Sequence, residues 1–521
     1  MRDQLEQVRT RLKLRRESRL RARVPGNFRC WLIHAFQAWL GARRLPRYGP
    51  GVTRSTEGVR WVLAVPALAF LYILLRPVSN GQILLPALMT LPVLGTVSVL
   101  LTRRKLDPRW LVVIGAQVAF WALGTGVGAG NRATLSQTYI WLGVPIVFWL
   151  AVWGMTERGL RLALDILTIG TAILGTAIVL YVGSQQGVLP TVIPPSLLTE
   201  SGAYFSGDYQ TFSGSQTAIQ LYGLVTLTAT VPILVASLLI QRDHLSPRLW
   251  LRVYAAVFGV LAALVAGRRA VLVTAVLTPL LLIVVRWLIS ARQPRRAVAQ
   301  GRRFVGVVTA FAMVAAVVVI GNLAFASQTV SGSVVSSSLN AVTSTFFGIG
   351  EVGGNISDVI RQQENQQLMQ GWSTSPLWGH GFGAVLQSGF VRSVDEPWNF
   401  ESQYHLLLFD TGIIGALLLL IAMSAVVMAI RAAVRARPDM APTLIITTIG
   451  GLAMMLAAAS NPFFQAPGYY WPMYLPLAAA NIALTTPRST VPPRISQLIR
   501  RSNRRQPDLL RTRPGQSLRR T

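Results

Sequence analysis

Long apolar stretches separated by short basic segments dominate the sequence. About 20 apolar residues in a helix cross the hydrocarbon core of a bilayer, and helices form there because each segment must satisfy its own backbone hydrogen bonds. The pattern predicts an all-α, polytopic membrane protein with about 12 transmembrane helices. These are residues 61–79, 83–101, 110–130, 138–155, 160–183, 218–240, 249–266, 269–289, 304–326, 404–429, 442–460 and 468–486.

The distribution of Lys and Arg predicts how these helices are oriented. With the N-terminus inside, 43 of the 49 Lys and Arg residues fall in cytoplasmic segments. The exceptions are Arg76, Arg132, Arg268, Arg269, Arg361 and Arg392. This bias follows the positive-inside rule. We therefore expect a multi-pass protein of the cytoplasmic (inner) membrane with both termini cytoplasmic.

The polar segments predict four regions. Residues 1–60 form a basic N-terminal segment, in which 27–41 is expected to be an interfacial helix, and 61–486 form the transmembrane bundle. A large extracytoplasmic loop, 327–403, lies within the bundle sequence, and its residues 355–372 are predicted to form a helix on the outer membrane surface. The basic tail 487–521 is expected to be disordered. Both tails either contact anionic membrane lipids or serve only to fix the orientation of the helices.

Aromatic residues gather near the predicted outer face. Tryptophan and tyrosine are enriched at membrane–water interfaces, where one end of the ring system meets water. We expect most of this group to form an aromatic belt rather than a sugar-stacking surface. Its members are Trp372, Trp378, Trp398, Tyr404, Tyr469, Tyr470 and Trp471.

Composition supports a membrane protein and argues against several kinds of site. Only 13% of the 521 residues are charged, against roughly 25% in soluble proteins. The net charge of +30 does not indicate a nucleic-acid partner, because the basic residues lie between apolar runs. A single cysteine, Cys30, excludes a disulfide framework, and four dispersed histidines argue against a zinc site. With no P-loop or nucleophile elbow in the sequence, we expect no metal and no cofactor.

Two groups of residues are candidates for chemistry. Arg268 and Arg269 form the polar part of a very short turn between two apolar spans, where guanidinium groups either reach lipid headgroups or clamp a phosphate-containing ligand. Glu401 and His405 are four residues apart and share one face of a helix. They are either a general-base pair or an interfacial histidine beside a carboxylate. Asp410, deeper in the same span, either contributes to chemistry or supports packing of the loop.

Three segments in order resemble the O-antigen ligase and polysaccharide polymerase superfamily of bacterial membrane glycosyltransferases. Gly267-Arg268-Arg269-Ala270-Val-Leu is similar to the family's Ser-Arg-small-Ala-Leu-Leu turn. Ser357-Asp-Val-Ile-Arg361, with Trp372 and Ser375-Pro-Leu-Trp-Gly-His-Gly-Phe-Gly383, resembles its helix and glycine-rich loop segment. Tyr404 to Gly415 resembles the start of the next helix, although Glu401 occupies the family's histidine slot and Ser402 its asparagine slot.

The resemblance implies a GT-C-like membrane glycosyltransferase. It would join or transfer glycan units carried on polyprenyl diphosphate at the outer face, without a metal and with inversion. Arg268 and Arg361, with Arg269 as second choice, would bind the diphosphate, and Glu401 assisted by His405 would be the base. The acidic residue at the histidine slot favours a polymerase over a ligase.

Partners and alternatives follow from the same resemblance. The partners would be a lipid-linked glycan donor, a glycan or lipid-linked acceptor and other polysaccharide assembly proteins. An O-antigen-ligase-type transfer to a terminal acceptor remains open. So does a 12-helix transporter or flippase, although the sequence lacks the internal repeat typical of transporters.

Overall fold

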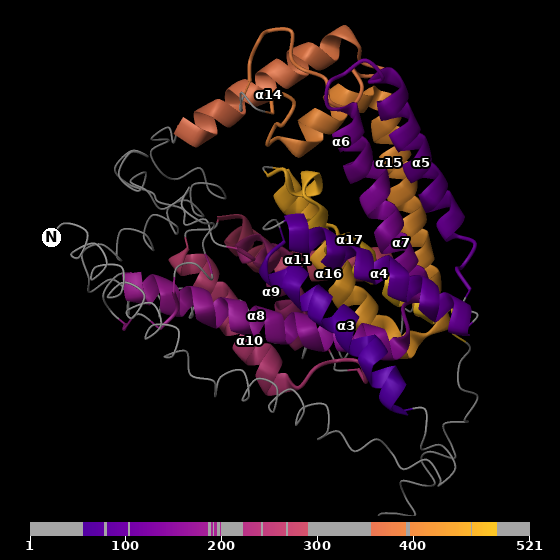
Figure 1. The fold of residues 1–521 in the computed structure, drawn as a ribbon, viewed down its shortest axis with the longest axis vertical. Coiled ribbons are helices and arrows are strands. Elements are labelled where there is room, and N and C mark those ends of the chain that lie inside the picture. Colours follow the sequence, from indigo (N-terminus) through magenta and orange to yellow (C-terminus); the bar gives the residue numbers. More distant parts are fainter. Residues whose placement is uncertain are drawn as a thin grey trace, which may run out of the picture. The chain divides into compact units, whose positions relative to one another are not determined.

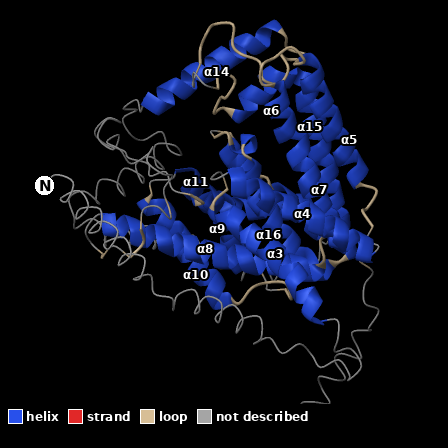
Figure 2. Cartoon of the chain, in the orientation of Figure 1, coloured by secondary structure: helices blue, strands red, loops and turns tan. Residues whose placement is uncertain are grey.

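The computed structural model describes residues 56–77, 81–102, 105–185, 189–190, 192–194, 198, 222–240, 243–266, 269–289, 356–391, 396–459 and 461–486. By its internal contacts the chain divides into Met1–Trp61 and Val62–Thr521. The helices below belong to the second unit, apart from the start of the first of them. Every regular element within the described ranges is a helix (Figure 2).

Eleven of the twelve predicted spans coincide with helices. In chain order these are α3 (Thr56–Leu75), α4 (Gly81–Thr102), α5 (Trp110–Val127), α6 (Thr134–Thr138) continued by the π-helix η1 (Tyr139–Gly143) and α7 (Val144–Gly154), α8 (Glu157–Gln185), η4 (Leu224–Thr226) with α9 (Leu227–Leu239), α10 (Leu249–Val265), α11 (Arg269–Ile289), α15 (Gln403–Ala436), α16 (Ala441–Ala458) and α17 (Trp471–Thr485). The predicted span 304–326 lies outside the described residues. The predicted loop helix is present as α14 (Ile356–Thr374).

The chain is a multi-pass membrane protein. Within the described ranges, seven helical segments are long and apolar enough to cross a membrane: those of α4, α5, α6–α7, α8, α11, α15 and α16. The distribution of side chains fits lipid, because large apolar residues point outward. On α15, Leu417, Leu420, Ile421 and Met428 are each at least half exposed. The last three follow Leu417 by three, four and eleven residues, which places all four on one face of the helix.

Close packing between helices uses small residues. Helices α4 and α7 cross where Gly95 meets Gly154, and a Cβ on Gly95 would lie 2.4 Å from the carbonyl oxygen of Leu150. Such approaches are typical of membrane helices, whose association depends on backbone proximity rather than on the hydrophobic effect. Helix α15 packs along α5, α8 along α10, and α16 against α9 and α17, while α14 lies across the end of α15 (Figure 1).

Three contacts between helix ends are compatible with helices that cross the membrane in alternating directions. The Arg76 guanidinium lies 4.6 Å from the centroid of the Tyr222 ring, and Tyr404 donates to the carbonyl of Met455 at 2.6 Å. At the other ends, Asp107 donates its backbone N–H to Asn481 at 3.1 Å. Each contact joins ends that the predicted orientation puts on the same side.

The aromatic-belt prediction is wrong for three residues. Tyr469, Tyr470 and Trp471 are 3–7% exposed and belong to the main core. Tyr470 donates to the carbonyl of Phe464 at 2.9 Å, and Trp471 makes an edge contact with Phe70. Their polar atoms and rings therefore serve packing between helices instead of an interface with lipid headgroups.

Candidate functional site

Helix α14 is anchored to α15 through its apolar face. Leu368 is fully buried in a cluster with Phe400, Leu406 and Phe409, while the glutamines at 362, 363, 366 and 370 are exposed. Glu364 is also fully buried, and its Oε1 accepts the backbone N–H of Ser402 at 2.6 Å. Ser402 immediately precedes α15, where N–H groups lack intrahelical partners. A side chain of α14 therefore fixes the start of α15.

Arg361 and Glu401 form an ion pair on this framework. The Nε–H of Arg361 donates to Oε2 of Glu401 at 2.8 Å, across 40 residues of sequence. The side chains are 31% and 25% exposed, respectively, so the pair is partly shielded but still open to a ligand. Two residues predicted to have separate roles are thus brought into direct contact.

Several polar atoms close to this pair in sequence have no hydrogen-bond partner. Gln403 is fully buried, and neither its amide nitrogen nor its amide oxygen is bonded. The same holds for Nδ1 of His405 and Oδ1 of Asn365. Buried polar groups are almost always paired, and other such atoms occur elsewhere in the described bundle, for example on Thr226, Thr228 and Thr230. Those beside the ion pair make the start of α15 a candidate for contact with a ligand. Glu364 and Asn365 on α14 and Gln403 at the start of α15 were not predicted from the sequence, because these residue types carry no recognisable motif there.

The other predicted diphosphate ligands are not located by this geometry. Arg268 lies outside the described residues, and Arg269 is the first residue of α11, with its side chain not described. Their membership of the same site stays a prediction.

Helix α15 is broken ten residues after it begins. Gly412 has φ 61° and ψ −164°, and the glycine-rich loop supplies the hydrogen bonds lost there. His380 and Gly381 donate to the carbonyls of Phe409 and Asp410 at 2.9 and 2.8 Å, and Ile413 donates to Pro376 at 2.9 Å. Irregular backbone at membrane depth is tolerated where protein satisfies it in this way. Asp410 therefore supports the packing of the loop through its backbone carbonyl, as one of its two expected roles required. Its side-chain Oδ1 is buried and has no hydrogen-bond partner.

The loop fits only because of its glycines. Gly379, Gly381 and Gly383 all have φ between 72° and 80°, and a Cβ on Gly381 would lie 2.0 Å from the backbone nitrogen of Gly128. Phe382, fully buried, anchors the loop by stacking on Trp141 with ring centroids 5.9 Å apart.

A polar cavity of about 360 Å³ lies between α14 and this loop. It is lined by Asn131, Gln367, Gln370, Gly371, Thr374, His380, Ala384, Val385, Leu386, Gln387, Ser388 and Phe409. His380 is held rigidly, with its ring stacked 4.7 Å from that of Phe409 and its Nε2 2.9 Å from the carbonyl of Gly371. Since a carbonyl only accepts, Nε2 carries the proton and Nδ1 is an acceptor.

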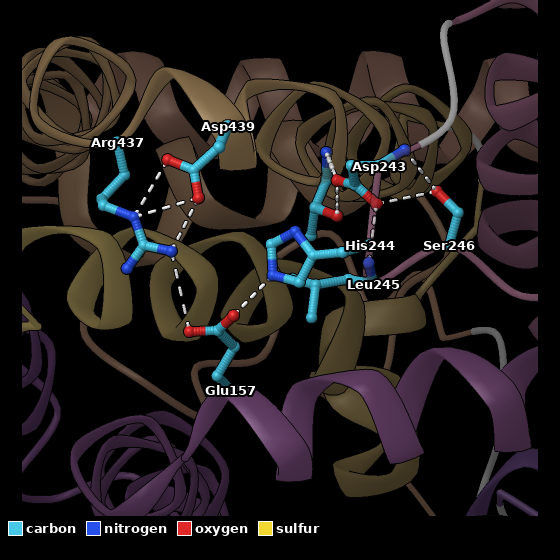
Figure 3. A network of polar contacts seen from close by, with 8 residues as sticks. Glu157, Asp243, His244, Leu245, Ser246, Arg437 and Asp439 are labelled. Atoms are coloured by element: carbon cyan, nitrogen blue, oxygen red, sulfur yellow. Dashed lines mark hydrogen bonds and ion pairs between the residues drawn. The ribbon is translucent and has the colours of Figure 1, made fainter. Parts of the chain in front are cut away.

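A second cluster of ionisable groups forms at the opposite end of α15 (Figure 3). Glu157 accepts from His244 Nε2 at 2.5 Å and pairs with Arg437 at 3.7 Å. Arg437 also pairs with Asp439 at 2.7 Å, and this hydrogen bond raises the pKa of Arg437. The carboxylate of Asp243 accepts from Ser246 and Thr443. These contacts join three interhelical loops, which is a structural role.

The resemblance noted in the sequence rested on three segments, two of which the structure describes. The glycine-rich loop and the first turns of α15 contact each other directly through the backbone hydrogen bonds at Phe409 and Asp410. The remaining segment, around Arg268, falls partly outside the described residues. No protein-family model and no curated protein matches this chain.

Proposed function

We propose that the protein is a membrane glycosyltransferase. It would polymerise glycan units carried on polyprenyl diphosphate at the outer face of the cytoplasmic membrane, independently of a metal and with inversion. The observation that carries this proposal is the Arg361–Glu401 pair, 2.8 Å between Nε and Oε2. Such a reaction needs both a cation that binds the diphosphate and a general base, and the pair places the two candidates on one framework.

The pair suggests where the donor binds. A diphosphate matches a guanidinium well, so its arrival at Arg361 would bring the donor beside Glu401.

The transfer itself is balanced. The acceptor hydroxyl oxygen forms a bond to the anomeric carbon while its proton passes to Glu401. The bond between the anomeric carbon and the diphosphate oxygen breaks, and its electron pair leaves with the diphosphate. Arg361 neutralises the charge that develops there. Attack opposite the leaving group inverts the anomeric centre. Glu401 precedes α15, which begins at Gln403, so Glu401 and His405 do not share a helix face as expected, and His405 would assist Glu401 from the first turn of α15.

The rival functions make different use of the same features. A ligase-type enzyme would use this chemistry once, on a terminal acceptor. A transporter or flippase is favoured by the broken helix α15, because interrupted helices are common in transporters. In this protein, however, backbone N–H groups of the glycine-rich loop donate to the carbonyls of Phe409 and Asp410 just before the break. These two carbonyls are therefore not available to coordinate a solute.

The test uses cells of the source organism that lack the protein and are complemented with Arg361→Ala, Glu401→Gln or Arg268→Ala. Loss of long glycans with accumulation of single lipid-linked units on the outer face is expected. Arg132→Ala and Glu396→Gln are matched controls, because both residues are exposed and neither belongs to the proposed site.

The alternative outcomes separate the rivals. Long lipid-linked chains that are not passed to an acceptor would indicate a ligase, and units retained on the inner face would indicate a flippase. Unchanged polymer in all three variants, at normal protein levels, would remove the enzyme proposal.

A further inference from the structure

The geometry points to the cavity between α14 and residues 380–388 as a binding site for an uncharged sugar unit. Its role as the acceptor subsite rests on the proposed function, whereas binding of the sugar does not. The cavity volume of about 360 Å³ lies within the range of about 300–1,000 Å³ that is usual for small-ligand sites.

The lining determines the chemical class of the ligand. None of the lining residues that the structure describes is Asp, Glu, Lys or Arg, so none of these side chains is a permanent charge that would pair with a phosphate or a uronate. The polar groups are amides and hydroxyls, contributed by Gln367, Gln370, Thr374, Gln387 and Ser388. Amides and hydroxyls both donate and accept hydrogen bonds, as sugar hydroxyls do. A neutral, polyhydroxylated ligand is therefore the best match.

One face of α14 is dedicated to this cavity. Gln367, Gln370, Gly371 and Thr374 are spaced by three, four and seven residues from the first, which is one side of a helix. The glycine lets α14 approach the opposite wall, since a Cβ on Gly371 would lie 2.7 Å from the ring of Phe409. The helix face is thus polar where it lines the cavity and small where it touches Phe409.

The opposite wall is already rigid before a ligand binds. His380 is fixed by Gly371 and Phe409, and Nδ1 is the acceptor that remains on its ring. Asn131 holds the loop carbonyl of His380 at 3.0 Å. A preformed wall lowers the entropy lost on binding, which suits a site for one sugar ring of a longer chain.

The cavity and the Arg361–Glu401 pair use different faces of α14. Gln370 is nine residues after Arg361 on the same helix, which corresponds to about 14 Å along the axis at 1.5 Å per residue and to about half a turn around it. The cavity would therefore hold a part of the glycan away from the reacting sugar.

A glycan array tests the inference with the full chain in lipid nanodiscs. The probes are neutral oligosaccharides and matched oligosaccharides that contain uronic acids. We expect binding of neutral members, weakened about tenfold or more in Gln367→Ala/Gln370→Ala, because two hydrogen-bonding amides are removed. The control Gln363→Ala/Gln366→Ala changes exposed glutamines of the same helix outside the cavity, and should bind like the wild type.

Three outcomes would overturn the inference: no binding of any neutral probe, preference for the acidic probes, or equal binding by the two double variants. Arg361→Ala on the same array separates this inference from the proposed function. It should keep glycan binding even though it is expected to abolish polymer in cells. If the site variants lose polymer in cells but the wild type binds no neutral glycan, the cavity inference alone is wrong. If the wild type binds neutral glycans but the site variants make normal polymer, the proposed enzyme function alone is wrong.

Discussion

The two ends of α15 carry polar clusters built in opposite ways. At the Arg437 end, made of Glu157, Asp243, His244, Arg437 and Asp439, the charged groups meet partners of opposite charge or hydrogen-bond donors. At the α14 end, made of α14, residues 375–391 and the first turns of α15, buried amide and imidazole atoms lack partners beside an open cavity.

The difference between the two ends indicates that one contributes to stability and the other is suited to binding. A matched network in a low-dielectric setting rigidifies what it joins, and the Arg437 end joins three loops in this way. Unmatched buried groups lower stability, so they persist where a ligand completes them. Real proteins depart from local consistency mostly at functional sites. The contrast indicates a structural role for the Arg437 end and supports the proposal of a ligand site at the α14 end.

The largest expected effect comes from Gly381→Ala in the loop at the α14 end. Its φ of 80° and the 2.0 Å approach to the nitrogen of Gly128 leave no room for a Cβ. We expect destabilisation of about 4 kcal/mol or more, seen as a large fall in the melting temperature in detergent. Gly389→Ala is the control, with φ 75° but nothing near its Cβ, and should cost about 1–2 kcal/mol. Similar falls for both would show that the loop is not wedged into the bundle.

A smaller effect distinguishes the two arginines. Arg437→Ala should lower the free energy of unfolding by about 2 kcal/mol, because the Arg437 side chain is only 10% exposed and joins Glu157 and Asp439, which are themselves partly exposed. Arg361→Ala should cost about 1 kcal/mol or less, since its pair with Glu401 is partly exposed. The measurement is thermal unfolding of both variants in the same detergent. If Arg361→Ala were the more destabilising, the pair would be structural and the comparison would fail.

The smallest expected effect has the opposite sign. Gln403→Leu removes a fully buried amide with no partner, and should raise stability by about 1–2 kcal/mol while lowering glycan synthesis in cells. Gln366→Leu, at an exposed position of α14, should stay within about 0.5 kcal/mol of the wild type. A stabilised variant with full activity would mean that Gln403 takes no part in function.

Much of the fold was predictable from the sequence. Apolar runs of membrane length located eleven described helices, and the stripe with Leu368 located α14 within the loop. Both signals are local, because length and periodicity act within one segment. The same reasoning failed at Tyr469, Tyr470 and Trp471, since an aromatic residue at a helix end looks the same whether it faces lipid or a neighbouring helix.

The candidate site was predictable only in part. Arg361 and Glu401 were chosen separately, one as an anion ligand and one as a base, and nothing in the sequence indicated that they touch. Glu364, Gln403 and the cavity were not predicted at all. Their importance comes from burial and from partners 38 or more residues away, as between Glu364 and Ser402.

The sequence by itself determined that this chain crosses a membrane repeatedly, because transfer into lipid depends on the length and polarity of each segment alone. Only the tertiary structure decided that α15 breaks at Gly412, since the missing backbone hydrogen bonds are supplied by a loop some 30 residues earlier in the chain. The tertiary structure also decided which charged groups form ion pairs and which buried polar atoms have no hydrogen-bond partner. Those properties depend on distances between segments, which no local pattern encodes.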